Sequence, residues 1–267
     1  MNSRLNLYTI SMDSSWCDKE ANLGLLENYL NQMPSNTDLV VLPELFSTSV
    51  ITDEEDVINN MSERNTGNTL QSLRDMANKY NVALAGSFIA RTEPRIYNRF
   101  FFIEPNGESY YYDKRHLFGR ENKYYARGNT LPPIIRYRGC NIMPIICYDI
   151  RFPCWCYNLK LKYDLLLVVA SWPKVREYAW EQLLIARAIE NQAYVCGSNR
   201  SGIDRTGLEF PELSSKIINY KGEPTGTKTT STSIWASLDI DALVEARNKF
   251  PVWKDSDDYD ILNNQML

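Results

Sequence analysis

Residues Ile142–Pro153 read I-M-P-I-I-C-Y-D-I-R-F-P. The apolar run Ile142–Ile146 has the length and the β-branched content of a buried strand, and Cys147 follows it directly. In an open α/β sheet, functional side chains are exposed at the carboxyl ends of the strands. Free cysteine is also one of the most buried residue types. Cys147 is therefore either a nucleophile or a core residue, and the other residues of the chain are needed to distinguish these two interpretations.

The composition is that of a globular protein. The chain has 267 residues, of which 44% are hydrophobic and 23% charged, and a chain of this kind buries about three quarters of its unfolded surface. The net charge is −4 and no basic run is present, so we expect no binding to nucleic acid or to a membrane. No long apolar stretch or signal-peptide pattern is present, which predicts a soluble, cytoplasmic protein.

The cysteines and the single histidine limit the metal chemistry that is possible. The six cysteines are Cys17, Cys140, Cys147, Cys154, Cys156 and Cys196. In a chain of this length without an export signal, we expect reduced thiols rather than disulfides. Cys154 and Cys156 are too close for a metal knuckle, and no cysteine–histidine pair has zinc spacing. His116 is the only histidine, which excludes centres that need several imidazoles.

Strands and helices alternate along the chain. The patterns predict strands at Leu5–Ile10, Asp38–Leu42, Val82–Phe88, Ile134–Tyr137, Ile142–Ile146, Leu165–Ala170 and Ala193–Ser198, helices at Glu20–Leu30, Leu70–Tyr80, Tyr178–Gln192 and Asp241–Lys249, and a hairpin of Tyr97–Ile103 with Ser109–Tyr112 around Asn106-Gly107. A hairpin follows a β-α-β segment in both parts of the chain. We therefore expect two halves whose sheets face each other, with helices outside.

Other segments carry weaker patterns. Ser47–Ser62 is expected to be an irregular loop, and Lys216–Tyr220 is expected to form a hairpin with Thr232–Ile240. No linker interrupts the chain, so the sequence predicts a single α/β domain over residues 1–267. The acidic tail from about residue 250 is expected to pack outside the core.

Three polar residues each follow an apolar strand: Glu44, Lys114 and Cys147. A parallel sheet would bring these strand ends to one edge, so we expect the side chains to converge there. A thiol with an ordinary pKa near 8.5 needs a base or a cation to become nucleophilic at neutral pH. Either Glu44 or His116 could be that base, since His116 lies two positions from Lys114 and starts on the same strand face.

Three segments resemble the signature segments of the carbon–nitrogen hydrolase, or nitrilase, superfamily. They are V-V-L-P-E-L-F (Val40–Phe46), Y-D-K-R-H-L-F (Tyr112–Phe118) and I-C-Y-D-I-R-F-P (Ile146–Pro153). The catalytic glutamate, lysine and cysteine of that superfamily fall on Glu44, Lys114 and Cys147. The resemblance continues through S-W-P (Ser171–Pro173), A-R-A-I-E-N-Q-A-Y-V (Ala186–Val195) and N-R-S-G (Asn199–Gly202), so it covers nearly the whole chain.

Within the superfamily, K-R-H-L-F, R-F-P-x-W and E-N-x-x-Y (Glu121–Tyr125) are most similar to the bacterial ω-amidase branch. Glu121 matches the second, assisting glutamate of the family. The resemblance implies a four-layer α-β-β-α sandwich, homodimers, and neither a metal nor a cofactor. It also implies that His116 is a hydrogen-bonded structural residue.

The resemblance implies acyl transfer through a cysteine thioester, with a small-molecule amide as substrate. Glu44 would take the thiol proton of Cys147, while Lys114 and the backbone N–H of Tyr148 would stabilise the oxyanion. Glu121 would orient Lys114 or the substrate amide.

For the substrate, the ω-amidase resemblance implies amides of short 2-oxo dicarboxylic acids, such as 2-oxoglutaramate and 2-oxosuccinamate. A guanidinium can bind the terminal carboxylate of such a molecule. Arg151 is the candidate by position, unless it pairs with Asp149. Trp172 and Phe118, together with Tyr148, are expected to line a narrow pocket.

Two alternatives stay open. The chain could be an amidase for N-carbamoyl or aliphatic amides, which the preference for acidic or neutral substrates would distinguish. It could instead be a thiol redox or binding module built on Cys147, Cys154 and Cys156, which predicts a reversible disulfide. The redox interpretation leaves Glu44 and Lys114 without a role.

Overall fold

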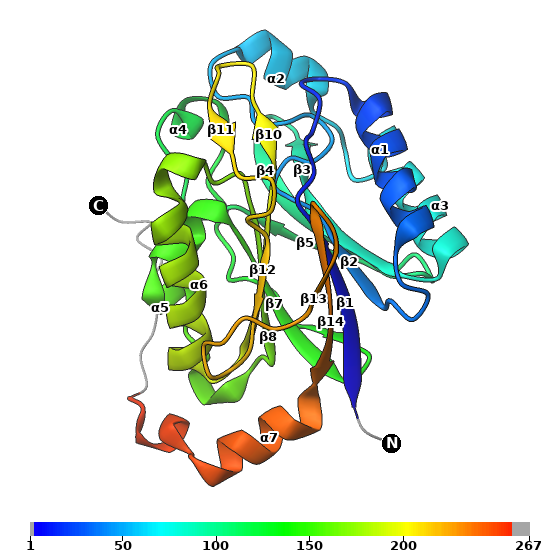
Figure 1. Ribbon diagram of the computed structural model, residues 1–267. Helices are drawn as coiled ribbons and strands as arrows, with labels where there is room; N and C mark the ends of the chain where they lie inside the picture. Colours follow the sequence, from blue (N-terminus) through cyan, green and yellow to red (C-terminus); the bar gives the residue numbers. More distant parts are fainter. Residues whose placement is uncertain (1–2, 258–267) are drawn as a thin grey trace.

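Two β-sheets pack face to face, and helices cover their outer surfaces (Figure 1). The computed structural model describes residues 3–257. The four layers are the α-β-β-α sandwich that the sequence predicts. No helix in the described part of the chain is long and apolar enough to cross a lipid bilayer.

The first sheet has seven strands, and its three central strands run parallel. In spatial order they are β13 (Thr227–Thr230), β14 (Ser233–Asp239), β1 (Arg4–Ile10), β2 (Leu39–Val41), β3 (Ala83–Thr92), β4 (Arg95–Ile103) and β5 (Ser109–Asp113). The hairpin predicted around Asn106-Gly107 is confirmed as β4 and β5. Gly107 has φ +88° there, a conformation that glycine adopts without steric cost.

The second sheet has five strands and repeats the plan of the first, with three parallel strands flanked by antiparallel ones. In spatial order they are β12 (Lys216–Ile218), β9 (Tyr194–Asn199), β8 (Leu165–Ala170), β7 (Cys140–Ile146) and β6 (Ile135–Tyr137). A separate two-stranded ribbon joins β10 (Gly202–Ile203) and β11 (Glu209–Phe210).

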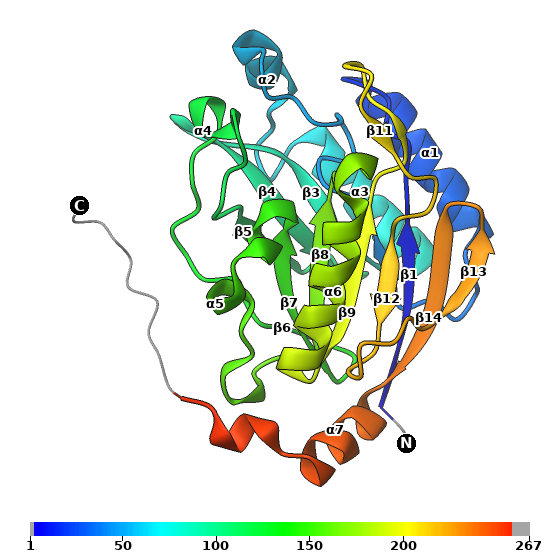
Figure 2. The ribbon, with the colours of Figure 1, turned by 60° about the vertical axis from the view of Figure 1, so that its left-hand side comes forward.

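The helices divide between the two outer faces (Figure 2). The first sheet is covered by α1 (Lys19–Gln32) and α3 (Asn68–Tyr80), the second by α5 (Pro153–Cys156) and α6 (Glu177–Asn191), and α7 (Ile240–Lys249) continues from β14 below both sheets. The short helices are α2 (Glu55–Met61), α4 (Glu121–Tyr124) and the 3-10 turns η1 (Cys147–Arg151), η2 (Leu159–Leu161), η3 (Lys174–Arg176) and η4 (Val252–Asp255).

The alternation of side chains along β2 produces both cores of the first sheet. Leu39 and Val41 point toward the second sheet, and Val40 points toward α1 and α3. All three side chains are fully buried, and burial of an aliphatic side chain of this size stabilises the fold by about 1.5–3 kcal/mol. A strand that is buried on both faces has apolar residues at every position. This continuous apolar run explains why the sequence predicts β2 although the strand is short.

Two sequence predictions are wrong. Ser233–Asp239 does not pair with Lys216–Ile218; it pairs with β1 in the other sheet, and Lys216–Ile218 pairs with β9. The turn at Lys221-Gly222 is a local signal, whereas strand pairing is decided by tertiary packing. Within Ser47–Ser62, residues Glu55–Met61 form α2, a helix too short to show a clear period, which buries Ile58.

The predicted tail can be followed only in part. Its first residues form η4, and Gln192 Nε2 donates to the backbone oxygen of Phe250 at 2.8 Å. The part of the predicted tail from residue 258 lies outside the described residues.

Candidate active site

Cys147 lies at the end of β7, where the chain turns into η1. Its φ is +45°, a left-handed conformation that is uncommon for a residue with a side chain. Such conformations persist where the surrounding structure enforces them, and they concentrate at functional sites. Here Asp149 Oδ2 accepts a 3.1 Å hydrogen bond from the backbone N–H of Ile146, which ties the turn to the strand end.

Glu44 follows β2 and is 3% exposed. Its Oε1 accepts from Lys114 Nζ at 2.7 Å and from Asn98 Nδ2 at 2.8 Å, and its Oε2 accepts from the backbone N–H of Ser171 at 3.0 Å. Three donors therefore fix both carboxylate oxygens. Because Ser171 follows β8 and Asn98 lies on β4, the two sheets together orient this side chain.

Lys114 follows β5 and is 1% exposed. Its Nζ also donates to Glu121 Oε1 at 2.8 Å, so the ammonium lies between two carboxylates. Burial acts to lower the pKa of Lys114, but attraction to Glu121 and Glu44 outweighs it and holds the pKa well above its usual value. Lys114 is therefore a permanent cation.

Glu121 is the second carboxylate on Lys114. Burial is the main cause that raises its pKa; the Lys114 ammonium opposes this, and the Glu44 carboxylate adds to it. Its other oxygen, Oε2, accepts from the backbone N–H of Phe118 at 2.7 Å. Glu121 thus fixes the position of the Lys114 ammonium through one oxygen and the backbone at Phe118 through the other.

The sulfur of Cys147 is close enough to Glu44 and Lys114 for both charges to act on it. Burial, followed by the Glu44 carboxylate, raises the pKa of the thiol well above its usual value, and the Lys114 ammonium opposes this rise. The resting cysteine is therefore a protonated thiol beside a carboxylate. This arrangement suits proton transfer to the carboxylate as the sulfur attacks.

The structure corrects how these residues come together. The sequence predicts one edge of a parallel sheet, but Glu44 and Lys114 follow strands of the seven-stranded sheet, and Cys147 follows a strand of the five-stranded sheet. β5 is also antiparallel to its neighbour. The residues converge because the two sheets face each other with these strand ends at the same end of the sandwich.

His116 is bound by Asp149 and packs on Phe152. Its Nδ1 lies 2.7 Å from Asp149 Oδ1, and its ring stacks on Phe152 with 3.7 Å between centroids. Asp149 is fully buried and also accepts from Tyr112 Oη at 2.8 Å. These contacts give His116 a structural part, and the carboxylate beside the sulfur is Glu44.

A narrow cavity of about 40 Å³ opens beside the sulfur. It is lined by Phe118, Cys147, Tyr148, Arg151, Ser171, Trp172, Pro173 and Arg176. All four residues predicted to bind substrate are among them. Arg151 lies over the Trp172 ring, 4.9 Å from its centroid, and the contacts of the described residues pair Asp149 with Tyr112 and His116 rather than with Arg151.

Arg176 is the pocket residue that sequence reasoning missed. It ends η3 and immediately precedes α6. In the sequence it is one of several charged residues after Ser171–Pro173, and no local feature distinguishes it from Lys174 as a pocket residue. Only the turn in three dimensions places one of these cations in the pocket.

Cys156, one of the three cysteines of the redox interpretation, is a buried core thiol. Neither Cys147 nor Cys156 is in a disulfide. Cys156 is buried, with burial raising its thiol pKa to about 12, and its Sγ contacts the backbone oxygen of Asp149 at 3.6 Å. A thiol of this kind is a core residue. No cluster of three or more histidine, cysteine, aspartate or glutamate side chains within residues 3–257 is arranged to hold a metal ion.

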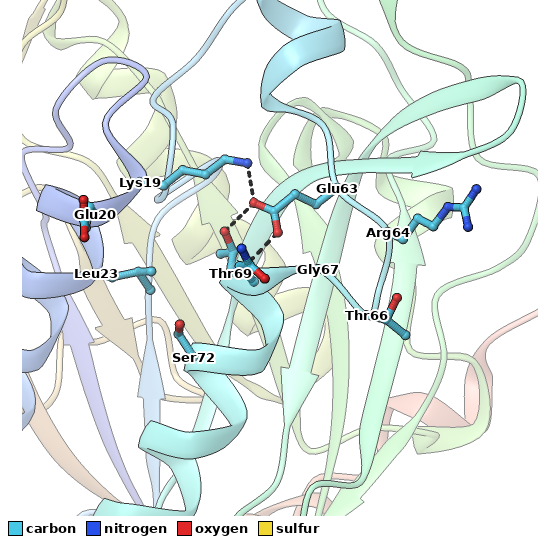
Figure 3. Close-up of a pocket in the computed structure, with 10 residues that line it drawn as sticks. Lys19, Glu20, Leu23, Glu63, Arg64, Thr66, Gly67, Thr69 and Ser72 are labelled. Carbon is cyan, nitrogen blue, oxygen red and sulfur yellow. Dashed lines mark hydrogen bonds and ion pairs between the residues drawn. The ribbon is translucent and has the colours of Figure 1, made fainter.

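A larger cavity, of about 700 Å³, lies elsewhere, between α1 and the start of α3 (Figure 3). Its central carboxylate, Glu63, is occupied: Lys19 donates to Oε1, and the backbone N–H of Thr69 donates to Oε2 at 3.0 Å. None of the described residues that line it is a cysteine or a histidine. The small cavity at Cys147 is the better candidate for chemistry.

The chain is similar to known proteins over almost its full length. Residues 7–248 match the family model described as carbon-nitrogen hydrolase. The chain is 40% identical over 255 residues to the ω-amidase YafV of Escherichia coli strain K12, with 91% of this chain and 93% of that protein covered. It is 30% identical over 257 residues to the 2-oxoglutaramate amidase of Bacillus subtilis strain 168, with 92% and 95% covered.

A solved structure agrees with this similarity. A CN-hydrolase superfamily protein from Xanthomonas campestris, whose active site carries an arsenic adduct, matches with a TM-score of 0.89 and 33% identity. The match covers 97% of this chain and 99% of that one.

Proposed function

The chain belongs to the carbon–nitrogen hydrolase family, and from that premise we propose that it is an ω-amidase. It hydrolyses the terminal amide of short 2-oxo dicarboxylic acid monoamides, such as 2-oxoglutaramate and 2-oxosuccinamate, to the dicarboxylate and ammonia. One observation carries the proposal: a buried ammonium held between two carboxylates lies beside a cysteine at the end of a small, arginine-lined cavity. The similarity to an ω-amidase and to a 2-oxoglutaramate amidase supports the choice of substrate.

The proposed reaction begins with proton transfer from Cys147 to Glu44 as the sulfur attacks the amide carbon. The proton then passes from Glu44 to the amide nitrogen, the carbon–nitrogen bond breaks, and ammonia leaves a thioester on the sulfur. Glu44 next takes a proton from water, whose oxygen attacks the thioester carbonyl. The carbon–sulfur bond then breaks as Glu44 returns its proton to the sulfur, which releases the carboxylic acid and restores both the thiol and the Glu44 carboxylate.

Charge stabilisation is assigned to the fixed donors of the site. Lys114 and the backbone N–H of Tyr148 stabilise the negative oxygen of each tetrahedral intermediate, and Glu121 holds Lys114 in place. Donors that are already oriented need no rearrangement as charge develops, which makes this contribution large. The short Lys114–Glu121 contact of 2.8 Å supports the positioning role.

Arg151 is assigned to the carboxylate at the other end of the substrate, with Tyr148, Trp172 and Phe118 as walls. The guanidinium lies over the Trp172 ring, so its N–H groups remain available for a bidentate contact. Tyr148 and Phe118 meet edge to face, with 5.1 Å between ring centroids. A small cavity with aromatic walls favours short, unbranched substrates.

Ammonia release from a panel of amides tests the substrate. The panel contains 2-oxoglutaramate, succinamate, glutamine, a neutral aliphatic amide and an N-carbamoyl amino acid. We expect the 2-oxo acid amide to give the highest kcat/KM. Preferential turnover of the neutral amide or of the N-carbamoyl compound would assign the chain to another amidase of the family.

We further propose that the protein is a cytoplasmic homodimer. Its buried cysteines Cys140, Cys156 and Cys196 are thiols, as is usual in a reducing compartment. α6 exposes the side chains of Tyr178 and Ile189, which lie three turns apart on the same side of the helix and would be covered by a partner subunit. Sedimentation velocity tests the dimer: a monomer at micromolar concentration would refute it. Cell fractionation tests the location.

A further inference from the structure

Arg176 lies at the pocket that holds Cys147, although it comes from a different segment than Arg151. Both guanidinium groups line the same cavity. The Arg176 Cζ is 5.1 Å from the centroid of the Phe118 ring, and the Arg151 Cζ is 4.9 Å from that of Trp172. Each cation rests on the face of an aromatic ring, which leaves the N–H groups at its edge available to a ligand.

These two cations differ from other arginine and lysine residues nearby. Lys174 Nζ pairs with Glu209 at 3.1 Å, and Arg187 pairs with Glu190 at 2.7 Å. Within residues 3–257, neither Arg151 nor Arg176 has a carboxylate at ion-pair distance, and the cavity lining contains no acidic side chain. The cavity lining therefore carries two positive charges, and the carboxylate that acts on the sulfur, Glu44, is itself bonded to Lys114.

The segment that carries Arg176 is fixed to the catalytic residues. The backbone oxygen of Arg176 accepts from Trp172 Nε1 at 2.8 Å, and the backbone N–H of Trp172 donates to Asn199 Oδ1 at 2.6 Å. The neighbouring N–H of Ser171 donates to Glu44 at 3.0 Å. The position of Arg176 relative to the reacting atoms is thus set by backbone contacts rather than by a mobile loop.

We propose that Arg176 is a second anion-binding residue of the active site, and that it selects acidic substrates together with Arg151. The ligand class is a short amide whose far end carries a carboxylate, with or without an adjacent keto oxygen that the second guanidinium would contact. The proposal rests on the proposed function for the identity of the substrate, but the anion site itself can be tested without amide hydrolysis.

The test compares alkylation of Cys147 by iodoacetate and by iodoacetamide. These reagents transfer similar groups to the same sulfur and differ in charge, so the ratio of their rates reports the charge of the pocket and cancels changes in thiol reactivity. Cys154 is exposed, so the protein carries Cys154→Ser, and alkylation is followed on the peptide that contains Cys147.

We expect Arg176→Gln to lower the iodoacetate-to-iodoacetamide ratio by about three- to tenfold, the range for one charge-assisted contact in a partly exposed site. Lys174→Gln is the matched control: it removes the same charge two residues away, outside the pocket, and should leave the ratio within about twofold. Arg176→Lys should restore part of the ratio. An unchanged iodoacetamide rate shows that the variant is folded.

Two results would overturn the proposal: an unchanged ratio in Arg176→Gln, or an equal decrease in Lys174→Gln. A second readout is steady-state kinetics, in which Arg176→Gln should raise KM for 2-oxoglutaramate more than it changes kcat. If no acidic amide is turned over but the alkylation ratio still falls, the anion site stands and the proposed substrate is wrong.

Discussion

Four ionisable side chains share one buried space at the active site, and their charges depend on one another. Lys114 bonds to both Glu44 and Glu121, and the carboxylate of Glu44 acts on the thiol of Cys147. Removal of the Lys114 charge leaves two buried carboxylates without a counterion, whereas removal of one carboxylate leaves the other paired with Lys114. A substitution that removes the ammonium should therefore mainly lower stability, whereas an isosteric substitution of one carboxylate should mainly change the chemistry of the site.

Lys114→Met should destabilise the protein by about 3–5 kcal/mol, because it leaves Glu44 and Glu121 buried without their counterion. Urea unfolding measures the change. Addition of Glu121→Gln should recover part of the loss, since one of the two carboxylates is then neutral. Equal stability of Lys114→Met and the wild type would show that the ammonium does not offset these charges.

Glu44→Gln should lower the pKa of the Cys147 thiol. In the wild type, burial and then the Glu44 carboxylate hold this pKa well above its usual value; a neutral amide removes the repulsion of the thiolate but keeps the shape. The pH profile of iodoacetamide alkylation should therefore move to lower pH in the variant, while amide turnover is lost. A move to higher pH would contradict the assigned charge of Glu44.

Among single residues, those that lie in a recognisable local sequence motif can be predicted from the sequence. Glu44, Lys114, Glu121 and Cys147 follow or begin recognisable segments and do come together. Arg176 could not be found in this way, because its placement depends on the turn between β8 and α6. The sequence positions alone also leave Glu44 and His116 open as the base, and the contacts of His116 with Asp149 and Phe152 favour Glu44 in the proposed mechanism.

At the scale of elements, one carboxylate joins the two segments that carry Cys147 and Lys114. Asp149, on η1, accepts through Oδ2 from Tyr112 Oη at 2.8 Å and from the Ile146 N–H at 3.1 Å. Through Oδ1 it accepts from the His116 N–H at 2.9 Å. These hydrogen bonds hold the end of β5 in the first sheet close to the end of β7 in the second sheet.

Asp149→Asn should reduce kcat at least about tenfold and destabilise the protein by about 2 kcal/mol, because an amide nitrogen cannot accept these hydrogen bonds. KM should change less than kcat, since the residue does not line the cavity. His116→Gln removes only one partner and serves as the milder control. Full kcat in Asp149→Asn would show that the link between the segments has no part in catalysis.

Elements with a strong local pattern were predictable, and elements decided by tertiary contacts were not. α6 shows its buried stripe in the sequence, and the β4–β5 hairpin shows its Asn-Gly turn. The pairing of β14 with β1 joins segments more than 220 residues apart and leaves no local trace. The helix α2 is too short for its period to be read.

At the scale of the whole molecule, the site exists only where the two sheets face each other. Glu44 and Lys114 come from one sheet, and Cys147 comes from the other. The sequence predicts two facing halves, but not that Glu44 and Lys114 lie in one half and Cys147 in the other. Catalysis should therefore require the complete sandwich, as in a single cooperative domain.

Activity and tertiary structure should disappear at the same urea concentration. Tryptophan fluorescence reports packing on both sheets, because Trp180 of α6 and Trp155 of α5 are buried in the core that includes the second sheet, and Trp235 packs on the outer face of the first sheet. Coincident transitions are expected for one domain. Loss of activity well before a separate fluorescence transition would mean that the halves unfold independently.

Rapid acid quench of the enzyme with 2-oxoglutaramate, followed by mass spectrometry of its peptides, tests the proposed thioester on Cys147 most directly. We predict an acyl group, with the mass of the substrate less ammonia, on the peptide that contains Cys147, and no ammonia release by Cys147→Ala. An acyl group on a different peptide, or undiminished ammonia release by Cys147→Ala, would contradict it.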